Sequence, residues 1–388
     1  KAIKNNGYKV KGSLKKNGFD RWRLVTSGFN KMTGEERTFL IEFYVVNPAL
    51  SPNDVVLGFK SRKAHSAADL QYALAGTQSA TNMQVEKYVQ PSFVMVKAAM
   101  LGLGGKQVNA YFPSSSLEIG KNDFIIKVAA GRDEECFLSD SECYGSVAVS
   151  VSKLNEMPEL LSQAGSLSWN LKFKKQISFS PDYRGKTIHW SSFGARTVFE
   201  GKIVLDGEEY LVTPKKSYGY IDKNWGKDFS SPFFHLSASN FTSLINGKSL
   251  DYSCLAVQGV YNEKLSVLAS LEDNKIEFHA DSHKKYSINF ECTEMPEDDD
   301  GVKLHWTVSV HDRKRVLDID IFCNISEMFI RDYESPEGGR KLLKVLGGGT
   351  GTGEMRLYKK IKKNLELIEY VRIANCICEY GNIDLPEK

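Results

Sequence analysis

The chain has 388 residues, 41% of them hydrophobic, and its 51 Lys and Arg residues against 48 Asp and Glu leave a formal net charge of +3. This length exceeds the size at which one hydrophobic core usually keeps growing, so two domains are expected. Both signs of charge are scattered along the chain, which argues against nucleic acid as a partner.

The seven cysteines form an odd set without a CxxC pair. This usage argues against a disulfide framework and against a thiolate zinc site, and it favours a reducing, cytoplasmic compartment. Neither a metal nor a cofactor is expected. The longest apolar stretches have about ten residues, half of what a bilayer span needs. The basic residues between Lys1 and Lys16 fit a solvated strand or peripheral contact with an anionic membrane.

Short segments in which apolar and polar residues alternate recur along the whole chain, bounded by Gly, Asp, Asn and Ser. This pattern is typical of half-buried antiparallel strands. Clear examples in chain order are 38–46, 124–129, 202–205, 209–212, 275–279, 286–292 and 302–310.

Residues 90–102 depart from this alternation because they are continuously apolar apart from Lys97. The segment fits either a strand buried on both faces or a lip over a cavity, and its length and β-branched content favour the strand. Helical patterning is scarce. The best short helix is 157–164, with Asn155 as its cap, and 66–75 is a second candidate.

Two hairpins are predicted. Asp206-Gly207 stands between two alternating runs and supplies the positive φ angles of a type I′ turn. The second hairpin covers 304–322 and turns near Asp312. Many strands without long intervening helices indicate an all-β sandwich or barrel fold. The short helix near residue 160 then marks a seam between an N-terminal domain of residues 1–165 and a C-terminal domain of residues 166–388.

The glycine-rich run from Gly347 to Gly353 invites a phosphate-binding interpretation, but it lacks both the P-loop ending and GxGxxG spacing. A flexible hairpin or a mobile gate at a cavity mouth is the better hypothesis. His279 and His283 are spaced for a metal site on a helix, yet their surroundings predict a strand followed by a turn. Cys376 and Cys378 share one face of an apolar strand and are expected in the core.

The densest group of chemically capable residues lies between residues 187 and 241. A carboxylic acid beside desolvating aromatic rings has a raised pKa and can donate a proton, and aromatic faces can stabilise a carbocation. The alternative is a structural corner in which Trp225 plugs the core and Asp222 pairs with Lys223 at the surface. The candidates are His189, Trp190, Tyr220, Asp222, Lys223, Trp225, Phe234, His235 and Asn240.

Residues 219–229, GYIDKNWGKDF, resemble the GY-[IA]-[DE]-K-[DN]-W-G-x-x-F signature of the tocopherol cyclase family. Residues 188–189, 201–208 and 239–241 resemble further segments of that family in the same order. The resemblance implies two lipocalin-like β-barrel or sandwich halves packed together, as in carotenoid hydratases and Diels–Alderases. It also implies protonation of a prenyl double bond and capture of the cation by a phenolic oxygen, without a redox cofactor.

Carried over by position, the resemblance makes Asp222 the acid and His189 a second acid or the hydrogen-bond partner of Asp222. Trp225 and Tyr220 become the cation-facing aromatics, and Lys223 tunes the pKa of the acid. Trp190, Phe234, His235 and Asn240 complete the substrate-binding set.

Three hypotheses follow for the function. The protein is a cyclase or hydratase acting on a prenylated or polyene substrate, a non-catalytic carrier of a lipid or isoprenoid, or a β-structured interaction protein without a cavity. The direction in which Asp222 and His189 point separates the first two, and a pocket separates the third. The sequence leaves the ligand and the oligomeric state open.

Overall fold

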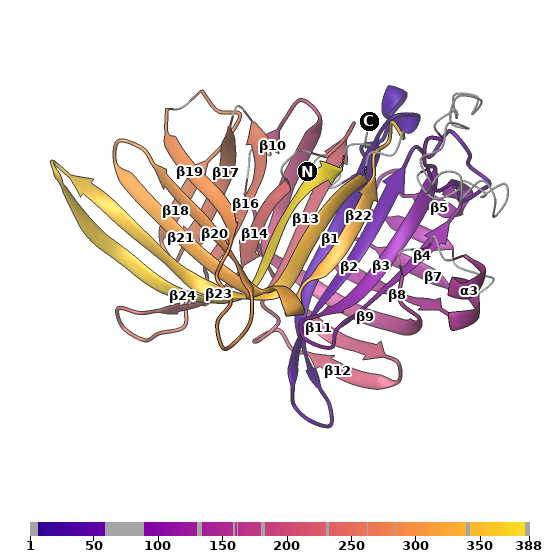
Figure 1. The fold of residues 1–388 in the computed structure, drawn as a ribbon, viewed down its shortest axis with the longest axis horizontal. Coiled ribbons are helices and arrows are strands. Elements are labelled where there is room, and N and C mark those ends of the chain that lie inside the picture. The colour runs from indigo at the N-terminus through magenta and orange to yellow at the C-terminus, as the bar shows by residue number, and fades with distance from the viewer. Residues whose placement is uncertain are drawn as a thin grey trace, which may run out of the picture.

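The computed structural model describes residues 7–58, 89–129, 134–157, 160, 162–179, 183–229, 233–261, 263–283, 285–338 and 342–384. Its residues form two large antiparallel sheets with few short helices, which confirms the predicted all-β fold of two lipocalin-like halves. The two halves lie side by side in Figure 1. The helical segments that the structure describes are α3 (Val151–Glu156) and the 3-10 turns η1 (Gly12–Lys15), η3 (Ser114–Ser116) and η4 (Ile325–Glu327).

The first half is a 13-stranded sheet with the order β4-β3-β2-β1-β12-β11-β9-β8-β7-β6-β5, in which β10 pairs with β11 and β13 pairs with β1 and β11. Its strands are β1 (Phe19–Asn30), β2 (Glu36–Val46), β3 (Phe93–Leu101), β4 (Lys106–Phe112), β5 (Leu117–Ile119), β6 (Ile126–Ala129), β7 (Glu135–Leu138), β8 (Glu142–Val149), β9 (Gly165–Ile177), β10 (Tyr183–Arg184), β11 (Ile188–Leu205), β12 (Glu208–Val212) and β13 (Gly219–Gly226).

The second half is an 11-stranded sheet with the order β18-β17-β16-β14-β24-β23-β21-β20-β19, in which β15 pairs with β24 and β22 with β23. Its strands are β14 (Phe233–Ala238), β15 (Asn240–Ser243), β16 (Cys254–Tyr261), β17 (Lys264–Leu271), β18 (Asn274–Phe278), β19 (Ser287–Glu294), β20 (Lys303–His311), β21 (Arg315–Asn324), β22 (Phe329–Glu334), β23 (Leu342–Ile361) and β24 (Asn364–Asp384).

The chain passes from the first sheet to the second between β13 and β14. The domain boundary predicted between residues 165 and 166 instead lies within β9, which pairs with β8 and β11 inside the first sheet. No described helix has the length and hydropathy needed to cross a bilayer.

Three apolar cores hold the molecule together. One lies on the inner face of the first sheet around Trp22 and Phe199, and another lies on the inner face of the second sheet around Trp306. The third core, around Tyr44 and Phe233, contains residues of both halves and forms the junction between them. Successive side chains of a strand point to opposite faces. A central strand therefore places every second side chain in the inner core of its own half and the others in the junction core.

Several local predictions are confirmed. The β11–β12 hairpin turns at Asp206 and Gly207, whose φ angles are 48° and 90°. The β20–β21 hairpin turns after His311. All nine residues of β3 are buried, as expected for a strand covered on both faces. Cys376 and Cys378 lie fully buried in the core of the second half.

Two local predictions are wrong. The run from Gly347 to Gly353 lies inside β23, where it pairs with β24 on one side and with the ends of β22 and β21 on the other, so it is neither a hairpin tip nor a gate. The short helix lies at Val151–Glu156, where the Ser150 side chain accepts a hydrogen bond from the backbone N–H of Lys153. The described residues of 157–164 are not helical. The second candidate helix, 66–75, lies outside the described residues.

Two glycines of the β11–β12 hairpin, Gly201 and Gly207, both have a positive φ but differ in the space around them. Gly201 has a φ of 138°, and a Cβ there would lie 2.1 Å from the carbonyl oxygen of Asn170, whereas a Cβ on Gly207 would meet nothing within 4 Å. We therefore expect Gly201→Ala to lower the free energy of unfolding by about 3 kcal/mol or more, and Gly207→Ala by about 1–2 kcal/mol. Urea unfolding measures both, and equal losses would contradict the clash.

Candidate functional site

The GYIDKNWG motif forms β13, and the alternation of the strand divides its side chains between two environments. Ile221 belongs to the inner core of the first half, whereas Tyr220 belongs to the junction core. Asp222 follows Tyr220 to the junction, while the Lys223 amine lies 3.7 Å from the ring centre of Trp22 in the inner core. Both side chains are fully buried. The predicted Asp222–Lys223 pair is therefore wrong, both as a tuned acid and as a surface pair.

At the junction, Asp222 is held by Arg23 of the neighbouring strand β1. The Arg23 Nε and Nη2 atoms donate to the two carboxylate oxygens at 3.0 and 2.9 Å, and the Trp190 indole donates to one of them at 2.9 Å. Burial is the largest influence and raises the pKa of Asp222, but the charge and hydrogen bonds of Arg23, together with the nearby His235 and Arg21, outweigh it, so the pKa lies below its usual value. The prediction that the pKa of Asp222 is raised is therefore wrong, because the sequence did not show that Arg23 lies beside Asp222.

The same guanidinium reaches into the second half. Its Nη1 donates to the Glu379 carboxylate of β24 at 2.5 Å, and its Nη2 lies 2.9 Å from Nε2 of His235 in β14. Since a guanidinium only donates, Nε2 accepts and the ring proton sits on Nδ1, which is 2.7 Å from Oε1 of Gln258. Burial and the Arg23 charge lower the pKa of His235 to about 3, so the ring is neutral at pH 7.

A second buried charged group lies beside the first. Glu42 accepts a hydrogen bond of 2.9 Å from the Tyr333 hydroxyl, and its carboxylate lies 3.6 Å from the Lys97 amine and 3.9 Å from Arg21. Arg21 also donates to the side chain of Asn224 at 2.6 Å. The junction core therefore encloses several ionised groups in an apolar surround.

Sequence analysis did not assign four residues of this junction to the site: Arg21, Arg23, Glu42 and Glu379. A usable signal was present in β1, where the two arginines, Arg21 and Arg23, stand two residues apart. Such positions must face one common surface. What this spacing could not show is that this surface is the face against the other half.

Several polar atoms near His235 have no hydrogen bond of standard geometry. The hydroxyl groups of Tyr220 and Ser192 lie near each other, but neither forms such a bond, and the same holds for Nε2 of Gln258 and Oγ of Ser237. All four side chains are buried. Buried polar atoms of this kind are usually satisfied by an ordered water or a ligand group.

The other face of β13 forms an aromatic group inside the first half. Lys223 contacts the Asp20 carboxylate, and its amine lies 5.5 Å from the ring centre of Trp225. His189 stacks on Trp225 with ring centres 5.2 Å apart, so Trp190, rather than His189, is the residue that donates to Asp222. Burial and the nearby Lys9 lower the pKa of Lys223.

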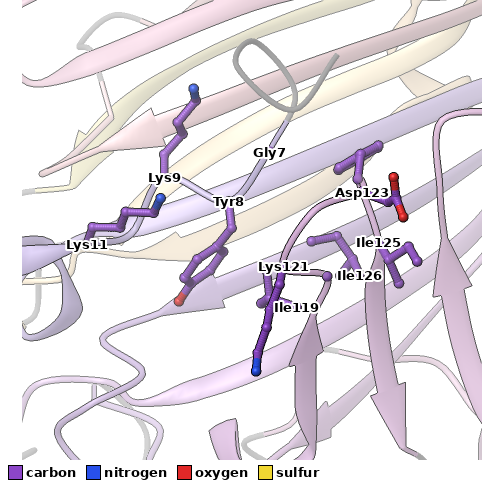
Figure 2. Close-up of a pocket in the computed structure, with 11 residues that line it drawn as sticks. Gly7, Tyr8, Lys9, Lys11, Ile119, Lys121, Asp123, Ile125 and Ile126 are labelled. Atoms are coloured by element: carbon purple, nitrogen blue, oxygen red, sulfur yellow. The ribbon is translucent and has the colours of Figure 1, made fainter. Parts of the chain in front are cut away.

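A pocket of about 380 Å³ opens above this aromatic group. The Tyr8 ring stacks on Trp22 with centres 6.3 Å apart, and Phe124 lies 6.4 Å from Trp22 on the other side. Figure 2 shows Tyr8 facing Ile119, Lys121 and Ile126 across the pocket. The residues that line it are Gly7, Tyr8, Lys9, Lys11, Ile119, Gly120, Lys121, Asp123, Phe124, Ile125 and Ile126.

Phe234 and Asn240 lie in neither group. Phe234 belongs to the inner core of the second half, where it packs against Phe290 with ring centres 5.4 Å apart. Asn240 bonds to the side chain of Asn375 at 2.5 Å. The structure thus distributes the predicted substrate-binding residues over four places: the junction, the aromatic group of the first half, the inner core of the second half, and the contact of Asn240 with Asn375.

No family model and no curated protein matches the chain. Several solved structures resemble it in fold, two of which follow. A candidate AttH protein from Nitrosomonas europaea has 11% sequence identity and a TM-score of 0.40, with 92% of each chain covered. Kievitone hydratase from Nectria haematococca has 9% identity and a TM-score of 0.42, with 96% of this chain and 91% of that chain covered.

Removing the guanidinium of Arg23 should strongly lower the free energy of unfolding. Arg23→Met leaves Asp222 and Glu379 buried without their cation, and a broken buried ion pair typically costs about 3–5 kcal/mol. We expect a loss of that size in urea unfolding. Lys31→Met, which removes a largely exposed partner of Glu209, should cost less than about 1 kcal/mol. A loss for Arg23→Met as small as that of the control would show that the junction does not depend on Arg23.

His235 should make the fold sensitive to mild acid. Between pH 6.5 and about 3, His235 is protonated in the unfolded chain but neutral in the folded protein. Stability at this site is therefore complete above pH 6.5 and falls with decreasing pH by up to about 1.4 kcal/mol per pH unit. His235→Gln should flatten the dependence of unfolding free energy on pH in this window, while His311→Gln, at an exposed site, should leave it unchanged. An unaltered slope in His235→Gln would contradict the neutral buried ring.

Proposed function

We propose that this protein binds a hydrophobic small molecule of the prenylated, isoprenoid or polyene type in the pocket above Trp22. The observation that carries the proposal is the continuity of the pocket with the aromatic group beneath it. Ile119, Phe124 and Ile126 provide apolar walls, and Tyr8 connects them to Trp22 through a ring stack. An apolar ligand in the pocket would contact these side chains, whereas Lys9, Lys11, Lys121 and Asp123 carry the charge of the lining.

The dimensions and chemistry of the pocket support this proposal. Its volume of about 380 Å³ falls in the range of about 300–1,000 Å³ that is typical of small-molecule sites. The lining residues Lys9, Lys11, Lys121 and Asp123 offer donors and an acceptor to a hydroxyl or phenol group. The Asp20–Lys223 pair is fully buried and lies outside the lining. Few polar groups among apolar walls are the usual means of orienting such a ligand.

Two residues of the segment that resembles the tocopherol cyclase signature, Lys223 and Trp225, lie near this pocket but outside its lining. Lys223 lies against Trp22, and the amine of the lining residue Lys9 lies 5.5 Å from the ring centre of Trp225. Asp222, the acid that the resemblance implied, faces the junction instead, and its lowered pKa keeps it ionised at neutral pH. An ionised carboxylate cannot protonate a double bond. We therefore propose binding without proton transfer from Asp222, the function of a carrier, and treat cyclisation or hydration as the alternative.

Filling the pocket should abolish binding. With a prenylated hydroquinone as the probe, binding should quench the fluorescence of Trp22 and Trp225. Ile119→Trp places an indole in the pocket, and we expect it to weaken binding by about tenfold or more, since overpacked sites cannot accept the same volume. Ile245→Trp, at a position that is 55% exposed elsewhere, is the matched control. Equal affinity of the wild type and Ile119→Trp would remove this pocket from the proposal.

Analysis of the recovered probe separates the two functions. A carrier returns the prenylated hydroquinone unchanged from both the wild type and Asp222→Asn. Formation of a chroman or a hydrated product by the wild type would establish catalysis, and its loss in Asp222→Asn with binding retained would restore Asp222 as a catalytic residue.

A further inference from the structure

The second half has a seam where its sheet ends. Strands β18 and β19 are the two outermost strands in the order of the 11-stranded sheet, yet they follow each other in the chain and lie in the same curved half (Figure 1). A pocket of about 910 Å³ lies at the segment that connects them and at the turn between β20 and β21. Its lining residues are Glu277, Phe278, His279, Asp281, Ser282, His283, Lys285, Tyr286, Asp312, Arg313, Lys314 and Arg315.

One side of this pocket is aromatic and continuous with the inner core. Phe278 and Tyr286 have ring centres 5.3 Å apart, and both belong to the core of the second half. Along β19, Ile288 and Phe290 pack against the same core but are only partly buried. An apolar chain that enters at the seam would therefore lie against core side chains.

The rim of the pocket carries an excess of unpaired positive charge. Two acidic residues of the lining already form ion pairs: Asp312 pairs with Arg315 at 3.2 Å, and Glu277 pairs with Lys275 at 2.7 Å. By contrast, the side chains of three lining cations form no ion pair with a described residue. These cations are Lys285, Arg313 and Lys314, and Asp281 is the remaining acid among the lining residues.

Two contacts connect the charged rim to the aromatic side. The Arg315 guanidinium lies 5.6 Å from the ring centre of Phe278 and also donates to the backbone carbonyl of Lys275 in β18. His279, with a side chain 12% exposed, bonds to Glu277 through Nε2, while its Nδ1 is buried without a partner in the described part of the chain. The pocket thus combines apolar surface, surplus positive charge and an unsatisfied imidazole nitrogen.

We propose that this seam is a second binding site, for an amphiphile that ends in a carboxylate. The apolar chain lies against Phe278 and Tyr286, and the carboxylate lies at Arg313 and Lys314, where the surplus charge complements it. The inference does not rest on the proposed function of the first pocket, because the two pockets lie in different halves and share no lining residue.

Displacement of the fluorescent probe 11-(dansylamino)undecanoic acid by laurate, dodecanol and dodecyltrimethylammonium tests the site. The three competitors share a chain of one length and differ in the charge of their heads. We expect laurate to compete at least tenfold better than the other two, and its apparent affinity to fall as salt is added.

The double variant Arg313→Glu/Lys314→Glu should weaken laurate binding by tenfold or more. Both residues are exposed in a turn, so the fold should persist, and circular dichroism checks this. Lys215→Glu/Lys216→Glu makes the same change in another exposed turn and should alter binding less than twofold. Ile119→Trp, which fills the first pocket, should leave laurate binding intact. Equal competition by dodecanol, or equal loss in both double variants, would overturn the proposal.

Discussion

The structure depends on one guanidinium buried between two sheets. Arg23 donates to Asp222 within its own half and to Glu379 of the other, and it lies against His235 as well. A cation removed from water is tolerable only when anions and acceptors surround it, so every neighbouring group is constrained in charge and position. The packing of the halves and the neutral state of His235 both follow from this requirement.

The pairing of Arg23 with Asp222 also separates the acid of the GYIDKNWG motif from the aromatic residues of the same motif. On one face of β13, Asp222 is committed to a charged junction. On the other face, Lys223 and Trp225 belong to an aromatic group under a pocket. The single strand β13 thus separates an ion-pair network from the aromatic group, because successive side chains of a strand point to opposite faces.

Much of the fold could be predicted from local patterns. Alternation located most strands, Asp206-Gly207 located a hairpin, and the apolar run in β3 indicated burial on both faces. The site could be predicted only in part, because its partners are distant in sequence. Arg23 and Asp222 are 199 residues apart, and Arg23 and Glu379 are 356 apart. Local spacing shows which residues share a face but not which face of another element will meet it.

The position of Glu379 also bears on the order in which the molecule assembles during synthesis. Every strand of the first sheet has been made once β13 is complete, whereas β24, which carries Glu379 and pairs with β14, β15 and β23, is the last described strand. Until β24 emerges from the ribosome, Arg23 has only Asp222 to neutralise it, and the first half presents its junction face to solvent. Contacts of such long sequence separation form late. A nascent chain that lacks the last strand would therefore expose the junction face of its first half, which carries both apolar side chains and the buried charges.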